Sequence, residues 1–312
     1  MAAEIPFIES LRALASHSGA RGLLDDAAVL ELGGRSLVLT HDMLVEAVHY
    51  LPDDPPADVA WKLVAVNLSD LAAKGARPVG VLLGYSLGED GWDEEFVAGL
   101  GTVLAAFGLP LLGGDTVRGN GPRTLALTAI GEASGPVPSR SGGRAGDHLW
   151  VSGTIGDSGA GLRGLKGEIA QVPELVERYR NPRPRLEAGQ RLAPLVGAMM
   201  DVSDGLLIDS SRLAQASSVA VRIDLASLPL SQALLAASGD GRRTRLAAAT
   251  AGDDYELLFA GAPERAAEIL TLQDELGLPL SRIGTLAEGS GLSLTEAGEP
   301  VPLPSRLGWI HC

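Results

Sequence analysis

The sequence has a single cysteine, Cys312, at its last position. One thiol can form neither an intramolecular disulfide nor a multi-cysteine zinc site, which fits a reducing compartment. Histidine is also scarce, since five residues are scattered along the chain and none belongs to a His-Glu-x-x-His motif. The lack of that motif argues against a zinc hydrolase.

Basic residues are also few relative to acidic residues. The 25 Lys and Arg residues are outnumbered by 39 Asp and Glu residues, and the formal net charge is −14. Nucleic acids and anionic membranes are bound by clustered basic residues, so neither is expected as a partner. The chain has no apolar run of about 18 residues that could cross a bilayer. Residues 1–22 fit neither a secretory signal nor an Arg-rich transit peptide, and we expect a cytoplasmic protein.

Two common catalytic signatures are missing or weak. No Gly-x-x-x-x-Gly-Lys-[Ser/Thr] sequence occurs, which excludes a P-loop. The tetrapeptide Gly156-Asp157-Ser158-Gly159 is similar to the nucleophile loop of serine proteases. Four residues are a weak signal, however, and an acidic α/β chain is the wrong setting for that chemistry. Acyl transfer is therefore not the expected reaction.

What the sequence does contain predicts a two-domain α/β protein. Its 312 residues are 46% hydrophobic and 21% charged, which is typical of globular proteins and allows two cores. Short apolar runs alternate with segments of helical periodicity. Residues 131–146 are rich in Gly, Ser and Pro, which is typical of a linker. We expect one domain at residues 1–137 and a second at residues 138–312.

The stretch that follows the first strands carries acids in unusual places. An apolar run over residues 36–40 stops abruptly at His41 and Asp42, so we expect Asp42 at the end of a strand. Residues 58–75 predict a helix that begins after Pro and ends at Gly.

Three polar residues of this helix, Asn67, Asp70 and Lys74, are spaced three and four residues apart and so share one face. The rest of the helix is largely apolar. A buried carboxylate is costly unless it is paired or bound to a metal. Asp70 is therefore a candidate ligand.

Acids recur after short apolar runs throughout the chain. Ligands of α/β proteins collect where such strands end and their loops converge. Carboxylates gathered in one cleft would repel each other, and divalent cations relieve that repulsion. Oxygen ligands suit Mg²⁺, which commonly bridges carboxylates to phosphates, so the pattern indicates phosphoryl transfer from a nucleotide. The acids are Asp42, Asp115, Asp157, Asp201, Asp204, Asp253 and Asp254.

Other segments complete the expected α/β pattern. A helix is predicted over residues 206–216, in which Asp209 is most simply an exposed acid. Residues 219–223 and 245–250 are predicted as strands, and residues 263–276 as a helix. Further strands are expected near residues 79–86, 110–112, 123–130, 147–152, 257–260 and 283, with a helix over residues 92–107.

Several motifs, taken together and in order, closely resemble those of the thiamine-monophosphate kinases. Related enzymes, such as aminoimidazole ribonucleotide synthetase and selenophosphate synthetase, share parts of the plan. The motifs are Asp25-Asp26-Ala-Ala-Val, Thr40-His41-Asp42 with His49, Asn67-Leu-Ser-Asp70, Gly-Gly114-Asp115-Thr, Gly-Thr-Ile-Gly-Asp157-Ser, Asp201-Val-Ser203-Asp204-Gly, Gly-Asp253-Asp254-Tyr-Glu256 and Gly308-Trp309-Ile-His311.

The resemblance implies a two-domain aminoimidazole ribonucleotide synthetase-like fold of α/β class with α+β character. It also implies a homodimer that pairs through the N-terminal domains. The implied reaction moves the γ-phosphoryl group of ATP directly to the phosphate of thiamine monophosphate, assisted by several Mg²⁺ ions, and gives thiamine diphosphate and ADP. Such a reaction needs positioning and charge neutralisation more than a covalent nucleophile.

The resemblance also implies roles for single residues. Asp42, Asp70 and Asp204 are the expected catalytic residues. The expected Mg²⁺ ligands are Asp26, Thr40, His41, Asp42, Asp70, Asp115, Asp201 and Asp204. The expected nucleotide contacts are Gly114, Asp115, Arg140 and Ser203, and the expected thiamine-side contacts are His49, Asp253 and Trp309.

Simpler interpretations remain open from the sequence. Trp309 could anchor the C-terminus, His49 could be a structural histidine and Arg140 could be a solvated loop residue. Another enzyme of the superfamily with a different acceptor is an alternative, although selenophosphate synthetase is disfavoured because no Cys lies near the N-terminus. A non-catalytic protein that binds metal or nucleotide is a further alternative.

Overall fold

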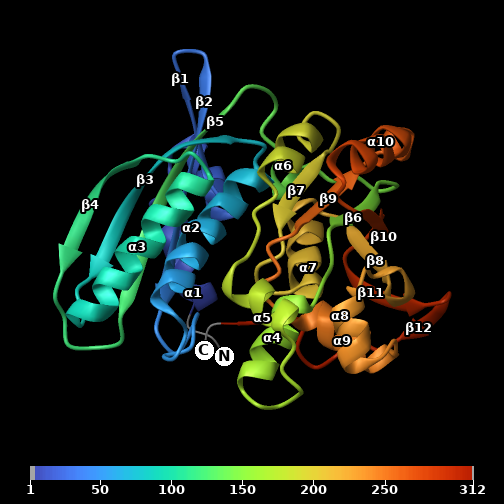
Figure 1. Cartoon of the computed structure of the whole chain (residues 1–312). Coiled ribbons are helices and arrows are strands. Elements are labelled where there is room, and N and C mark those ends of the chain that lie inside the picture. Colours follow the sequence, from blue (N-terminus) through green and yellow to red (C-terminus); the bar gives the residue numbers. More distant parts are fainter. Residues whose placement is uncertain (1–3, 311–312) are drawn as a thin grey trace.

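A computed structural model describes residues 4–310 and shows two sheets, each with its own helices (Figure 1). His311 and Cys312, the end of the predicted C-terminal motif, lie outside the described residues. The mixed α/β class and the two-part architecture agree with the sequence-based expectation. The division of the chain near residue 137 stays a prediction.

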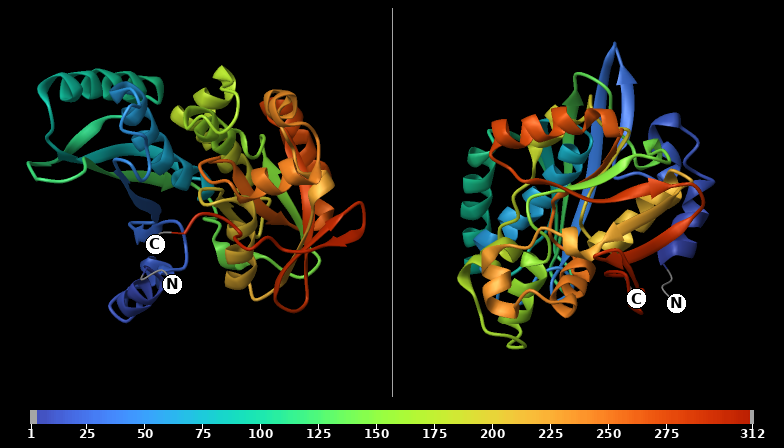
Figure 2. Two further views of the ribbon diagram at one scale, coloured as in Figure 1. Left: turned by 90° about the horizontal axis from the view of Figure 1, so that it is seen from below. Right: turned by 90° about the vertical axis from the view of Figure 1, so that its right-hand side faces the viewer.

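The first half of the chain forms a five-stranded sheet in the order β1-β2-β5-β3-β4. Only the β3–β4 pair is parallel. Helices α2 and α3 cover one face, whereas α1 projects away from the sheet (Figure 2). The elements are α1 (Glu4–Arg12), the 3-10 helix η1 (Ser18–Leu23), β1 (Ala28–Leu32), β2 (Arg35–Val45), α2 (Pro56–Ala73), β3 (Arg77–Ser86), α3 (Asp90–Ala106), β4 (Leu111–Val117) and β5 (Thr124–Ala133).

The second half forms a seven-stranded sheet in the order β12-β11-β8-β10-β6-β9-β7, in which only the β11–β8 pair is parallel. Its helical elements are η2 (Arg140–Gly142), α4 (Asp157–Leu165), α5 (Pro173–Arg180), α6 (Leu186–Leu192), α7 (Leu206–Ala216), η3 (Leu225–Ser227), α8 (Gln232–Ser238), α9 (Arg242–Thr250), η4 (Pro263–Arg265) and α10 (Ala266–Leu276). Its strands are β6 (His148–Ser152), β7 (Ala198–Asp201), β8 (Ala220–Asp224), β9 (Leu257–Gly261), β10 (Leu280–Ala287), β11 (Gly291–Glu296) and β12 (Glu299–Val301).

Two local predictions are wrong. Residues 245–250 were expected as a strand but belong to helix α9, because their Ala-rich sequence favours a helix. Strand β2 does not stop at Asp42 but continues to Val45, since every residue from Ser36 onward pairs with β5. Asp42 therefore lies inside a strand, and alternation of side chains turns it toward α2.

Helix α2 joins the two halves and carries much of the site. Thirteen of its side chains are buried, because the helix packs on the first sheet and also contacts α6, α5 and β7. The contact with α6 is very close at Gly189, where an added Cβ would lie 1.9 Å from the carbonyl oxygen of Ala72. Only glycine allows the two helices to approach this closely.

We expect opposite effects from the same substitution at two helical glycines. Gly189→Ala should lower the free energy of unfolding by about 1–3 kcal/mol, because its methyl group collides with the backbone of α2. Gly101→Ala, on the exposed side of α3 where nothing lies within 4 Å of the added Cβ, should raise it by about 0.5–1 kcal/mol. Urea denaturation measures both, and equal shifts would contradict the close approach of α2 and α6.

Candidate functional site

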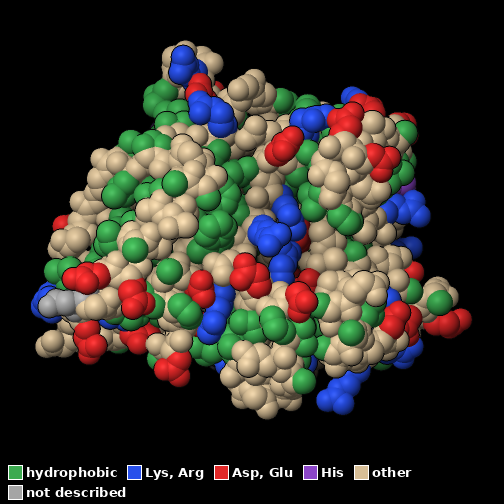
Figure 3. All heavy atoms as spheres, viewed as in Figure 1, with side chains coloured by type: hydrophobic (Ala, Val, Ile, Leu, Met, Phe, Trp, Pro, Cys, Tyr) green, Lys and Arg blue, Asp and Glu red, His purple; other side chains and the backbone are tan. Residues whose placement is uncertain are grey.

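A cleft of about 1040 Å³ lies where the two halves meet. Residues of β2, α2, α4, α5, β7 and α9 line it, together with residues of the turn after β2 and of the loops after β7, before β9 and after β12. On the face shown in Figure 3, Lys and Arg side chains gather along the junction of the halves. Nine residues with predicted roles line the cleft: His41, Asp42, His49, Asp70, Asp201, Ser203, Asp204, Asp253 and Trp309.

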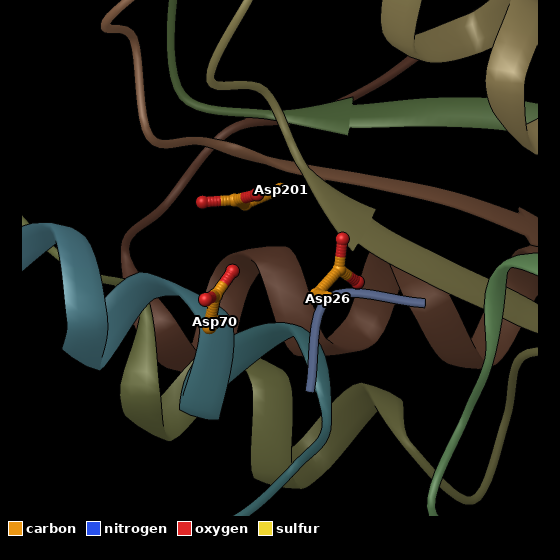
Figure 4. A group of neighbouring side chains, drawn as sticks. All are labelled: Asp26, Asp70 and Asp201. Atoms are coloured by element: carbon orange, nitrogen blue, oxygen red, sulfur yellow. The ribbon is translucent and has the colours of Figure 1, made fainter. Parts of the chain in front are cut away.

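Three carboxylates converge at the junction although they are far apart in the sequence. Asp26, Asp70 and Asp201 each offer an oxygen, and these oxygens lie within 4.8 Å of one another (Figure 4). Asp70 projects from α2, Asp201 ends β7 and Asp26 lies in the loop before β1. All the donors are hard oxygen atoms, which is the ligand type that Mg²⁺ and similar divalent cations prefer.

The energetics of Asp70 and Asp201 favour a bound cation. Burial raises the pKa of Asp201 to about 8, with the charges of Asp26, Asp209 and Asp42 adding to the effect. Burial and the charges of Asp42 and Asp201 likewise raise the pKa of Asp70 well above its usual value. The Ser69 hydroxyl donates to Asp201 at 2.6 Å, and the Thr40 hydroxyl donates to Asp70. These hydrogen bonds fix the orientation of two carboxylates that lack a cationic partner in the described contacts.

Asp26 has a different environment because two cations lie beside it. Lys74 Nζ lies 2.6 Å from one carboxylate oxygen, and Arg140 Nε donates to the other at 2.8 Å. Burial alone would raise the pKa of Asp26, but Arg140 and Lys74 lower it to about 2. Lys74 also bonds Asp25. Arg140, an expected nucleotide contact, thus bonds a predicted metal ligand in this structure.

Asp42 and Asp204 lie at the edge of the three carboxylates. Burial and the charges of Asp26 and Asp204 raise the pKa of Asp42 to about 6. Its backbone N–H donates to the side chain of Asn67 at 3.1 Å, which anchors β2 to α2. Asp204 pairs with Arg212.

The expectation that Asp209 is an exposed helix acid is wrong. Its side chain is fully buried, and one carboxylate oxygen accepts hydrogen bonds at 3.1 Å from the backbone N–H groups of Ser203, Asp204 and Gly205. Asp209 therefore shapes the loop that carries Asp204. Helical periodicity could have revealed this, because position 209 shares a face with the buried positions 206 and 213.

The predicted thiamine-side residues line the same cleft from both halves. His49 Nδ1 accepts a hydrogen bond from the backbone N–H of Val45 at 3.0 Å, so the neutral ring carries its proton on Nε2. Asp253 has a left-handed backbone, φ 68°, and pairs with Lys62 at 2.8 Å. Trp309 is 50% exposed, and its backbone N–H donates to the carbonyl of Asp204 at 2.8 Å.

Three residues with predicted metal or nucleotide roles lie away from the three carboxylates or point away from them. The His41 ring lies on the opposite face of the sheet and makes a 2.8 Å hydrogen bond with Thr128. Gly114 and Asp115 lie on β4, where every residue is exposed. Asp115 is three strands from β2 across the sheet, which is about 14 Å.

Metal-free protein is expected to lose stability as the pH rises from about 4 to about 8. The folded-state pKa values of Asp42 and Asp201, about 6 and about 8, exceed the usual value near 3.9. The folded protein therefore binds protons there that the unfolded chain has released, and each group costs up to about 1.4 kcal/mol per pH unit. Asp26 acts in the opposite direction, but only below about pH 4.

Thermal unfolding in EDTA between pH 5 and 8 measures this slope. Asp201→Asn should flatten it, and added Mg²⁺ should raise the Tm more at pH 8 than at pH 6. A Tm of the wild-type protein that stays constant or rises over this range would contradict the prediction.

Sequence comparisons place both halves in one family. Residues 24–133 match the family described as "AIR synthase related protein, N-terminal domain", and residues 144–296 match "AIR synthase related protein, C-terminal domain". The thiamine-monophosphate kinase of Caulobacter vibrioides is 43% identical over 93% of this chain and 84% of its own length. That of Escherichia coli K12 is 38% identical over 93% of this chain and 91% of its own length.

Solved structures agree with this assignment. AaThiL complexed with AMPPCP and TMP superposes with a TM-score of 0.85 at 31% identity and covers 98% of this chain and 97% of that chain. The thiamine-monophosphate kinase of Stenotrophomonas maltophilia K279a gives a TM-score of 0.78 at 38% identity and covers 95% and 96%. The hydrogenase maturation protein HypE in complex with ATP, at 20% identity and a TM-score of 0.69 over 96% and 95%, shares the fold alone.

The described residues, 4–310, include no helix with the length and hydropathy needed to cross a membrane. With two family domains that together span most of the sequence, and with kinases of 38–43% identity aligned along nearly its full length, the chain belongs to the thiamine-monophosphate kinase family of AIR synthase related proteins.

Proposed function

We propose that this chain transfers the γ-phosphoryl group of ATP to the phosphate of thiamine monophosphate and so forms thiamine diphosphate and ADP. The observation that carries the proposal is the convergence of Asp26, Asp70 and Asp201 at a cleft that also contains His49 and Asp253. Membership of the kinase family and the close likeness to AaThiL complexed with AMPPCP and TMP support the same substrates.

The proposed metal is Mg²⁺, bound as several ions. Asp26, Asp70 and Asp201 would hold it at the centre, with Asp42 and Asp204 at the edge and Thr40 orienting Asp70. His41 would contribute only through its backbone carbonyl, because its side chain bonds Thr128. When bound, the ions supply the positive charge that a transferring phosphoryl group needs.

The residues of the chain itself would mainly position the two phosphates. The acceptor is already an anionic phosphate oxygen, so no strong general base is required, and none of the carboxylates has to remove a proton from it. His49 Nε2–H and the Asp253 carboxylate would contact the thiamine moiety, and the half-exposed indole of Trp309 would pack against one of its rings. Ser203 would contact the nucleotide beside Asp204.

A homodimer is the proposed assembly, and the uncovered face of the first sheet is the proposed interface. This face carries Met43 and Leu82, which are 49% and 39% exposed, beside Leu39 and Ile130. Asp115 lies on the same face and in the same row as Met43 across the sheet. A two-fold axis along the strands would place β4 of one subunit over β2 of its partner, so Gly114 and Asp115 would lie at the interface, and their contacts with nucleotide and Mg²⁺ stay predictions.

The direct test mixes the purified protein with ATP, Mg²⁺ and thiamine monophosphate and separates the products by chromatography. We expect thiamine diphosphate and ADP in equal amounts, and EDTA should abolish both. Hydrolysis of ATP without thiamine diphosphate would indicate a different acceptor. Binding of ATP without any turnover would favour a non-catalytic role.

Removing one central carboxylate should separate catalysis from folding. Asp70→Asn is expected to lower kcat by at least about 100-fold, because it weakens the charge that holds the metal at the phosphates. The metal-free variant should be at least as stable as the wild type, since a repelled, buried charge has been removed. Steady-state kinetics and thermal unfolding measure the two effects.

Asp274→Asn, an exposed acid on α10, is the matched control and should change neither quantity. An Asp70→Asn variant that keeps wild-type kcat, or that unfolds, would argue against the assigned role.

The dimer has its own test. Light scattering after gel filtration should give the wild-type protein twice the 32.2 kDa chain mass. Leu82→Asp places a charge in the proposed interface and should give a monomer. Leu270→Asp changes a residue that is 46% exposed on α10 and should leave the dimer intact. A monomeric wild type, or dissociation by both variants, would refute this interface.

A further inference from the structure

A buried ammonium group lies behind the thiamine side of the cleft. Lys62, on α2, is only 2% exposed, although lysine is rarely buried without partners. Its Nζ lies 2.8 Å from an Asp253 carboxylate oxygen and donates to the carbonyl of His49 at 3.1 Å. It also lies 4.0 Å from the centre of the Tyr179 ring. Carboxylate, carbonyl and aromatic face together satisfy this charge.

The three partners of Lys62 come from different parts of the fold and meet only at the cleft. His49 lies in the turn after β2, Tyr179 in α5 and Asp253 in the loop before β9. All three line the cleft, whereas Lys62 itself does not. Lys62 therefore acts on anything bound in the cleft through these neighbours.

The unfavourable backbone conformation of Asp253 is stabilised by hydrogen bonds with other residues. Its φ of 68° and that of Tyr255, 51°, lie in the left-handed region, which residues other than glycine adopt at a cost. The backbone N–H of Asp253 donates to the carbonyl of Ser203 at 2.7 Å, and the Tyr255 hydroxyl donates to its second carboxylate oxygen at 3.1 Å. Lys62 holds the remaining carboxylate oxygen. Both carboxylate oxygens of Asp253 thus accept a hydrogen bond, one from Lys62 and the other from Tyr255.

We infer that Lys62 is a positioning residue for the acceptor. It fixes the Asp253 carboxylate of the second half and the His49 turn of the first half relative to each other, so that the thiamine side of the cleft has one defined shape. This inference rests on the proposed roles of His49 and Asp253. Among the described residues, the hydrogen bonds and the ion pair of Lys62 reach His49 and Asp253 but none of Asp26, Asp70 or Asp201, so its effect should be confined to the acceptor.

The test is Lys62→Met, which keeps the length of the side chain and removes the ammonium. In steady-state assays of the full chain with Mg²⁺, we expect the KM for thiamine monophosphate to rise at least tenfold. The KM for ATP should stay within twofold of the wild type. Equal rises in the two KM values, or an unchanged KM for thiamine monophosphate, would overturn the inference.

A double-mutant comparison distinguishes positioning from general damage. If Lys62 acts through Asp253, the variant Lys62→Met with Asp253→Asn should have the same acceptor KM as Asp253→Asn alone. Multiplied effects would overturn the inference. The double variant leaves no unpaired buried charge, so it carries the test if Lys62→Met alone does not fold.

Arg180→Met is the matched control, because Arg180 also joins the halves through an ion pair, with Asp54 at 2.8 Å, but does not line the cleft. It should lower the Tm and leave the ratio of the two KM values unchanged.

Calorimetric titration of wild type and variants with thiamine monophosphate alone separates this inference from the proposed function. A wild type that binds thiamine monophosphate but transfers nothing refutes the function, and tenfold weaker binding by Lys62→Met then still supports the inference. Equal affinities of wild type and Lys62→Met overturn it, whether or not transfer occurs.

Discussion

Mutual repulsion among buried carboxylates is the constraint around which the two halves are arranged. Asp26 and Asp70 come from the first half and Asp201 from the second, yet their oxygens lie within 4.8 Å. Burial strengthens the repulsion because water screens these charges less than it would at the surface. The fold withstands it by holding each carboxylate with its own donors: the Thr40 and Ser69 hydroxyls from the side of β2 and α2, and Lys74 and Arg140 around Asp26.

Helix α2 carries several of the residues that hold the carboxylates in place. Its apolar side chains pack on the first sheet, whereas Ser69 and Lys74 reach the second half, where they bond Asp201 and the carbonyl of Met199. Lys62, two turns earlier, makes the corresponding contact on the thiamine side. One helix thus sets the metal side and the acceptor side at a fixed separation, which suits a reaction governed by the relative placement of two phosphates.

The sequence predicts the helices and strands better than the tertiary contacts between them. Helix α7 spans residues 206–216 as expected, because its apolar spacing is regular. Most of the acids that line the cleft, although not Asp42, are recognisable near Gly and Ser. The burial of Asp209 does not follow from its residue type, because acids are usually exposed, and it depends on the helical face that the residue occupies. The strand predicted at residues 245–250 is a helix, and the short apolar run has no period that distinguishes the two.

The pairing of Asp26 with Arg140 and of Asp253 with Lys62 could not be read from the sequence. These partners are 114 and 191 residues apart, and only the packing of the two halves defines their distance. Local pattern holds no information about such contacts. For the same reason, the outward position of Asp115 depends on the order and register of the strands, which local sequence does not specify.

The contacts between the halves also constrain how the chain can change over time. Asp26 with Arg140, Ser69 with Asp201 and Lys62 with Asp253 each take one partner from either side of the segment between β5 and β6. A substitution in one half therefore alters the fitness of substitutions in the other. Chimeras that join the first half of one homologue to the second half of another would inherit mismatched pairs, so the two halves are expected to diverge in concert rather than as exchangeable modules.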